Sequence, residues 1–135
     1  MPVIQSEIDA NSPEFVQNRE AMLKAIASFR DVEQLVLNKA NEAKAKFDKR
    51  GQLLPRERIN LLLDPGAPFL ELASLAGYKL HDDKDGSMAG GGIIAGIGYI
   101  QGVRCLVIAN NSAIKGGTIS PAGLKKSLRL QQIAF

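Results

Sequence analysis

The sequence predicts an α/β fold in which helices precede and follow a β-hairpin. Helical spacing of apolar residues runs from about residue 13 to residue 50, two β-rich runs follow at 91–100 and 103–110, and another helical pattern begins at Ser120-Pro121. Of the 135 residues, 45% are hydrophobic and 23% are charged, a balance typical of a folded chain and not of a disordered one. We therefore expect a layered domain with helices against a sheet.

Charge, cysteine and the N-terminal pattern limit the function classes. The net charge of +3 is spread along the chain, so nucleic-acid binding is weakly supported. Cys105 lies in an apolar run, where a thiol acts as a small hydrophobe, and the only histidine, His81, lies in a charged loop. Neither thiol catalysis nor a metal site is indicated. No leader or membrane span is recognisable, which favours a bacterial cytoplasm over a mitochondrial matrix.

Residues 1–52 are predicted to form a helical hairpin, and residues 53–135 a second unit. Ser12-Pro13 can start a first helix that ends near Phe29. Asp31 can cap a second helix, which Gly51 ends. The apolar stripes of this antiparallel pair suit a contact with another subunit.

The next segment predicts a short helix, a turn and a strand. Pro55 fits a helix start, Asp64-Pro65-Gly66 a tight turn, and residues 69–72 alternate between apolar and polar as a strand does. Arg56 and Arg58 are candidate anion donors, although basic residues at an exposed helix start commonly stay solvated. Residues 81–88, rich in polar residues and glycine, predict a surface loop.

The two β-rich runs predict a hairpin whose turn is Gln101-Gly102. The second run is nearly all apolar, as in a strand covered on both faces. Glycines at 90–92, 96 and 98 lie before and within strands and not at a strand-to-helix turn, so they do not fit a dinucleotide fingerprint. They predict close backbone packing instead.

The segment from Asn110 to Pro121 is the candidate binding site. It runs from a strand end through Lys115-Gly116-Gly117 into a helix that begins at Ser120-Pro121. Glycines permit close backbone approach, lysine offers a point charge, and a helix N-terminus favours a phosphate. A loop that only turns the chain is an equal alternative on these residues alone. In this last helix, we expect Leu124, Leu128 and Ile133 to point toward the core and Lys125-Lys126 and Arg129 to point toward solvent. The helix has no capping residue at Phe135, which suggests a fragment.

Several blocks together resemble the carboxyltransferase β subunits of biotin-dependent acyl-CoA carboxylases: residues 56–72, the hairpin ending in residues 107–111, Lys115–Thr118 and Lys125–Arg129. The resemblance is nearest to the methylcrotonyl-CoA and geranyl-CoA branch, and Ile119-Ser120 before Pro121 is similar to the geranyl-CoA type. It implies a crotonase-like fold of ββα units, of which residues 53–135 would begin the N-terminal carboxyltransferase domain.

The resemblance also implies cofactor, substrate and partners. Carboxybiotin on a biotin carboxylase and biotin carrier α subunit would donate the carboxyl group to an acyl-CoA, and the β subunits would form a hexameric ring. The coenzyme A side would involve Ala113, Ile114, Lys115, Gly116 and Gly117, with Arg56 and Arg58. No catalytic residue is assigned, because the oxyanion donors would lie beyond residue 135, so this chain alone is expected to be inactive. The alternatives are a propionyl-CoA-type carboxylase and a non-enzymatic interaction module.

Overall fold

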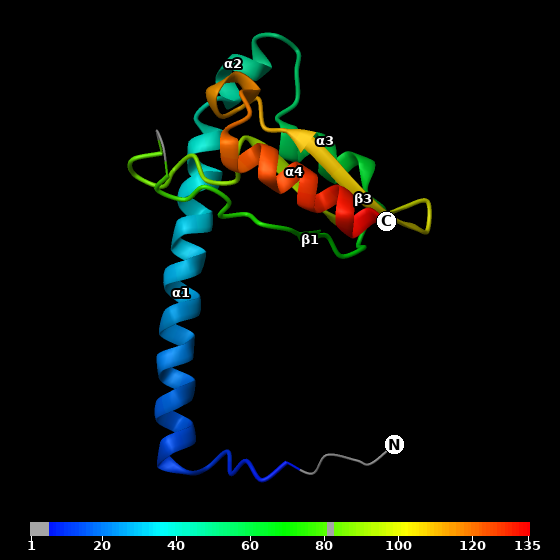
Figure 1. Ribbon diagram of the computed structural model, residues 1–135. Helices are drawn as coiled ribbons and strands as arrows, with labels where there is room; N and C mark the ends of the chain where they lie inside the picture. Colours follow the sequence, from blue (N-terminus) through cyan, green and yellow to red (C-terminus); the bar gives the residue numbers. More distant parts are fainter. Residues whose placement is uncertain (1–5, 81–82) are drawn as a thin grey trace. The chain divides into compact units, whose positions relative to one another are not determined.

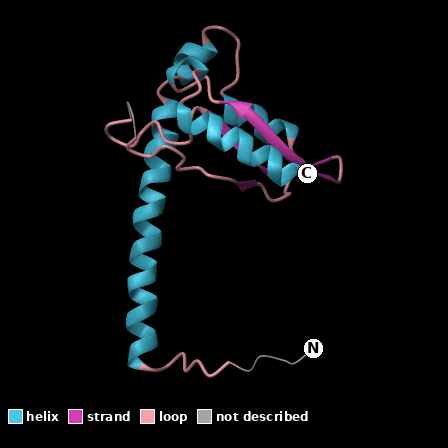
Figure 2. Cartoon of the chain, in the orientation of Figure 1, coloured by secondary structure: helices cyan, strands magenta, loops and turns pink. Residues whose placement is uncertain are grey.

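The computed structural model describes residues 6–80 and 83–135, and its contacts divide the chain into two units, Met1–Asp31 and Val32–Phe135. Helix α1 (Pro13–Asn41) begins in the first unit and ends in the second (Figures 1 and 2). Its start is as predicted, because the Ser12 hydroxyl accepts a hydrogen bond from the amide of Phe15 at 3.2 Å. His81 lies outside the described residues.

The predicted break between two helices near residue 30 is wrong. Helix α1 continues through Asp31 to Asn41, and only the short helix α2 (Lys44–Asp48) follows it, so the segments predicted as an antiparallel pair form one helix. No glycine or proline occurs between Pro13 and Gly51, and an aspartate that could cap a helix is tolerated on an exposed helical surface. The domain boundary after residue 52 stays a prediction.

Helix α3 (Pro55–Leu62) and strand β1 (Leu70–Glu71) form where the sequence predicts them. The Glu57 carboxylate accepts a hydrogen bond from the amide of Leu54 at 2.7 Å and so satisfies the helix start. After α3 the Asp64 carboxylate accepts hydrogen bonds from the amides of Gln101 and Gly102 at 2.6 and 2.7 Å. This contact ties the end of α3 to the hairpin turn.

The predicted hairpin is confirmed as β2 (Ile93–Ile100) and β3 (Val103–Asn110), paired antiparallel in a sheet of order β1-β2-β3. Its turn residues Gln101 and Gly102 both have positive φ, as a two-residue hairpin turn with the twist of the strands requires. The buried central strand is β2. The expectation that the second strand is covered on both faces is wrong, because β3 is at the edge of the described sheet and Ile108 is 45% exposed.

Alternate residues of β2 face opposite helices. Ile94 packs with Ile59 of α3 and Val107 of β3, whereas Ile93 and Ala95 pack with Leu130 of α4 (Pro121–Ala134). The sheet therefore separates α3 from α4. A further cluster joins the end of α1 to the segment after β3 and contains Val36, Ala40, Ala89 and Ile114. Cys105 is half-buried beside the Ile94 cluster, as a small apolar side chain would be.

The predicted inward face of α4 is wrong. The buried residues of this helix are Gly123, Lys126 and Leu130, whereas Leu124, Leu128 and Ile133 are 59%, 54% and 45% exposed. Residues 123, 126 and 130 share a face at helical spacing, so the pattern offers two possible stripes. Gly123 decides which stripe is buried, because the helix face that carries this glycine can approach the backbone of Gly91 closely. A Cβ added at Gly91 would lie 2.6 Å from the Gly123 nitrogen.

The segment predicted as a surface loop, residues 81–88, is partly buried over its described part, residues 83–88. Asp83 and Ser87 are each 4% exposed. The Asp83 carboxylate accepts hydrogen bonds from the amides of Lys79 and Met88 at 3.1 and 3.0 Å, so the acidic side chain replaces water for these backbone groups. The prediction was wrong at these two positions because a polar side chain can itself organise a buried turn.

Candidate functional site

The candidate loop leaves β3 and forms a short 3₁₀ turn, η1 (Lys115–Gly117). Three successive residues, Lys115, Gly116 and Gly117, have positive φ values of 47°, 66° and 86°. This conformation is uncommon for lysine and frequent for glycine. The Thr118 hydroxyl donates a hydrogen bond to the Lys115 carbonyl at 3.0 Å and closes the turn. A Cβ added at Gly116 would meet nothing within 4 Å, so the backbone there is open to a ligand.

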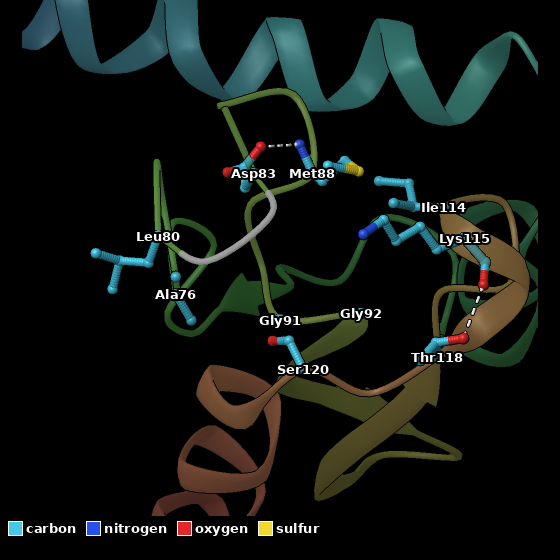
Figure 3. Close-up of a pocket in the computed structure, with 11 residues that line it drawn as sticks. Ala76, Leu80, Asp83, Met88, Gly91, Gly92, Ile114, Lys115, Thr118 and Ser120 are labelled. Carbon is cyan, nitrogen blue, oxygen red and sulfur yellow. Dashed lines mark hydrogen bonds between the residues drawn. The ribbon is translucent and has the colours of Figure 1, made fainter. Parts of the chain in front are cut away.

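The small pocket beside Lys115 does not have room for a nucleotide. Its volume is about 40 Å³, enough for ordered water and not for an adenine ring. Figure 3 shows Gly91, Gly92, Lys115, Thr118 and Ser120 around this pocket, with the Lys115 side chain extending into it. A large ligand would therefore lie on the outer surface of the loop.

A larger groove lies where α3 meets the end of β3. Its volume is about 570 Å³, and its lining includes Arg58 and Ile59 of α3 and Asn110 and Ser112 after the exposed Ile108. An adjoining groove again contains Arg58 and Ser112. The structure thus brings Arg58 to the start of the candidate loop, with a groove large enough for part of a small-molecule ligand. Sequence periodicity gave no signal for this groove, because it depends on the packing of α3 against the strand end.

The second predicted arginine lies elsewhere. Both terminal nitrogens of Arg56 donate hydrogen bonds to the Glu71 carboxylate, at 2.7 and 2.9 Å. This bidentate pair links α3 to β1. The predicted role of Arg56 as an anion donor stays a prediction, and the geometry favours a structural role.

The first two residues of the predicted loop anchor it to the core. Ile114 is 5% exposed and packs with Val36, Ala40 and Ala89, and Ala113 packs against the same cluster. Just before them in the chain, the side-chain oxygen Oδ1 of buried Asn111 has no hydrogen-bond partner in the described part of the chain. The buried side chain of Ile114 is therefore unavailable to a ligand, whereas Ala113 is only partly buried.

Lys126 was missed by the sequence reasoning, which placed it on the solvent side. It is 5% exposed, and its Nζ donates hydrogen bonds to the carbonyls of Ile93 at 2.8 Å and Gly90 at 3.3 Å. Burial lowers the pKa of Lys126 to about 8, while the charge of Glu71 raises it and that of Arg56 lowers it. The ammonium thus remains mostly protonated at neutral pH and serves as a buried donor.

The described residues contain no group of three His, Cys, Asp or Glu side chains that could hold a metal ion. Over the same residues, no helix is long and apolar enough to cross a membrane.

The family model, the related sequences and the solved structures that match this chain all belong to carboxyl transferase proteins. The carboxyl transferase domain model matches residues 46–135. The geranyl-CoA carboxylase β subunit of P. aeruginosa is 74% identical over 98% of this chain, with a TM-score of 0.88. The probable mitochondrial methylcrotonoyl-CoA carboxylase β chain of Drosophila melanogaster is 43% identical over 133 residues, and the 3-methylcrotonyl-coenzyme A carboxylase β1 subunit of Mycobacterium tuberculosis is 49% identical over 93 residues.

This chain spans only part of these proteins: 25% of the P. aeruginosa subunit, 23% of the Drosophila chain and 17% of the mycobacterial one. The propionyl-CoA carboxylase β chain of Cereibacter sphaeroides is more distant, at 34% identity over 64% of this chain. A transcarboxylase 12S structure, described as a hexamer, is 20% identical with a TM-score of 0.69 and supports the fold alone.

The predicted bacterial cytoplasm is wrong as an assignment. Relatives that match 98% of this chain in Drosophila, Dictyostelium and Arabidopsis are mitochondrial, while bacterial proteins match as well. The N-terminal residues could not decide the compartment, because similar proteins occur both in mitochondria and in bacteria.

Proposed function

Since this chain belongs to the carboxyl transferase domain family, we propose that it is part of the β subunit of a biotin-dependent acyl-CoA carboxylase. The substrate would be an unsaturated acyl-CoA, 3-methylcrotonyl-CoA or geranyl-CoA. The observation that carries this proposal is the 74% identity and TM-score of 0.88 to a geranyl-CoA carboxylase β subunit over 98% of the chain. The same likeness confirms the crotonase-like α/β class and the family resemblance expected from the sequence.

In this reaction, carboxybiotin supplies an activated carboxyl group for the acyl-CoA. The residues of this chain would bind and orient the coenzyme A end of the substrate. Lys115 would pair with a phosphate as a point charge, and the open backbone at Gly116 would approach the nucleotide closely. Arg58 would supply a second cation from the groove along the end of β3. We assign the described residues no contact with biotin and no catalytic proton transfer.

The partners follow from the proposed reaction. We expect a biotin-bearing α subunit as the donor of the carboxyl group and a hexameric ring of β subunits. The biotin dependence named for the mycobacterial β1 subunit supports the first expectation. The hexameric ring is expected from the family resemblance of the sequence alone.

The choice between geranyl-CoA and 3-methylcrotonyl-CoA rests on few residues. Ser120 has a structural role, because its hydroxyl accepts a hydrogen bond from the amide of Gly123 at 3.1 Å and caps α4. Ile119 is 48% exposed and remains the candidate specificity position. The propionyl-CoA alternative is less favoured, because the propionyl-CoA carboxylase β chain matches a smaller part of this chain at lower identity.

A carboxylation assay tests the proposal. The complete subunit that carries this sequence, paired with its biotin-bearing subunit, would be assayed with geranyl-, 3-methylcrotonyl- and propionyl-CoA. We expect one of the two unsaturated substrates to have the highest kcat/KM. A preference for propionyl-CoA would reject the substrate class, and absence of biotin-dependent carboxylation with all three would reject the reaction.

A further inference from the structure

One turn, residues 90–92, holds both ends of the candidate loop. The Gly92 carbonyl accepts a hydrogen bond from the amide of Asn111 at 2.8 Å, where the loop begins. The Gly91 carbonyl accepts one from the amide of Ser120 at 3.4 Å, where the loop ends. Neighbouring peptide units of a single turn therefore fix the separation of the two ends.

The glycines of this turn leave no space for side chains. A Cβ added at Gly91 would lie 2.6 Å from the nitrogen of Gly123, and one added at Gly92 would collide with the carbonyl oxygen of Thr118 within the loop itself. The turn thus lies directly against both α4 and the candidate loop, and a shift of the turn would move the loop with it.

Lys126 holds the same turn from the side of α4. Its ammonium donates to the carbonyl of Gly90, just before Gly91, and to the carbonyl of Ile93, just after Gly92, so its hydrogen bonds bracket the turn. Lys126 is 5% exposed, and its ammonium is bonded to these two carbonyls in place of water. A charged donor buried in this way makes stronger hydrogen bonds than a neutral one.

We propose that Lys126 is a positioning residue for the coenzyme A ester: it fixes the turn at residues 90–92, which holds Asn111 and Ser120 and thereby sets the position of Lys115. Lys126 itself does not touch the ligand. The binding part of this inference rests on the function proposed above. The mechanical part, that Lys126 orders the turn and the loop ends, does not depend on that function.

The test compares Lys126→Met with Lys125→Met in the complete subunit. Lys125 is the exposed neighbour on the same helix and undergoes the same chemical change. The first readout is amide hydrogen exchange at Gly90, Asn111 and Ser120, measured against Ile97 in the centre of the sheet. The second is KM and kcat for the preferred acyl-CoA.

For Lys126→Met we expect exchange at the three amides to rise about tenfold over wild type while exchange at Ile97 changes little, because the local opening of the turn becomes easier. We also expect KM to rise about fivefold while kcat changes little, since loss of a binding contact without loss of transition-state contacts appears in KM. Lys125→Met should change neither readout. Gly123→Ala, whose Cβ would collide with the Gly91 carbonyl, disturbs the turn independently and should give the same pattern.

Exchange that rises equally at Ile97 and at the three amides would mean that Lys126 only stabilises the fold, and would overturn the inference. Faster local exchange with an unchanged KM would also overturn it, provided that Lys115→Glu raises KM. If neither Lys126→Met nor Lys115→Glu changes KM, the assignment of the loop to coenzyme A fails instead.

Discussion

Replacement of Lys126 by methionine should remove a specific pH dependence of stability. The pKa of this lysine is lowered from its usual 10.5 to about 8 in the folded chain, chiefly by burial. Between these two values the unfolded chain binds more protons than the folded chain, so the folded state gains stability as the pH rises. Well below pH 8 both states are protonated, and this gain with pH is absent.

The magnitude follows from the two pKa values. Between pH 7 and pH 9 the linkage relation gives wild type a gain of about 1.3 kcal/mol over Lys126→Met, and the full shift corresponds to about 3 kcal/mol. Urea unfolding of wild type and variant at both pH values measures this difference, because groups that titrate alike in both proteins cancel. Lys125→Met is the control and should follow wild type.

An equal change in stability of wild type and Lys126→Met between pH 7 and pH 9 would refute the reasoning. It would mean that the ammonium is solvated or that its two carbonyl partners offset the cost of burial. A relative loss for wild type would contradict even the sign of the shift.

Other substitutions test separate contacts. Asp64→Ala should lower the free energy of unfolding by about 2 to 4 kcal/mol, since two charge-assisted hydrogen bonds to the hairpin turn are lost; urea denaturation measures this, and a loss below 0.5 kcal/mol would show that the contacts contribute little. Gln101→Asn should raise stability by about 0.5 kcal/mol, because asparagine tolerates the positive φ better; a lower melting temperature would count against it. A double-mutant cycle on Arg56→Met and Glu71→Gln should give a coupling of about 1 kcal/mol, as expected for a partly exposed pair, and no coupling would remove the pair as a link between α3 and β1. Lys115→Glu should raise the KM for the acyl-CoA about tenfold in carboxylation kinetics, because it reverses the charge that we propose pairs with a phosphate; an unchanged KM would exclude Lys115 from the site.

The elements that the sequence predicts well are those fixed by local chemistry. The hairpin formed as expected because Gln101-Gly102 takes the positive φ values that join two adjacent strands. The start of α3 at Pro55 and the close backbone packing of the glycines also follow from single-residue properties. For the same reason, the strand-to-helix loop around Lys115 could be located from the sequence.

The features that the sequence could not show include contacts between distant residues. Leucines at 124 and 128 mark an apolar stripe, but the approach of Gly123 to Gly91 turns the other face of α4 inward and buries Lys126. The pairing of Arg56 with Glu71, fifteen residues away, likewise depends on how α3 meets β1. Local patterns do not contain this information, because the partner residues are known only once the chain has packed.

The crystal structure of the complete subunit with a bound coenzyme A ester tests the central claim most directly. We expect a phosphate or the adenosine within hydrogen-bond distance of Lys115 Nζ or of the backbone at Gly116 and Gly117. A coenzyme bound elsewhere, with no contact to this loop, would contradict the assignment and leave the loop as a connection between β3 and α4.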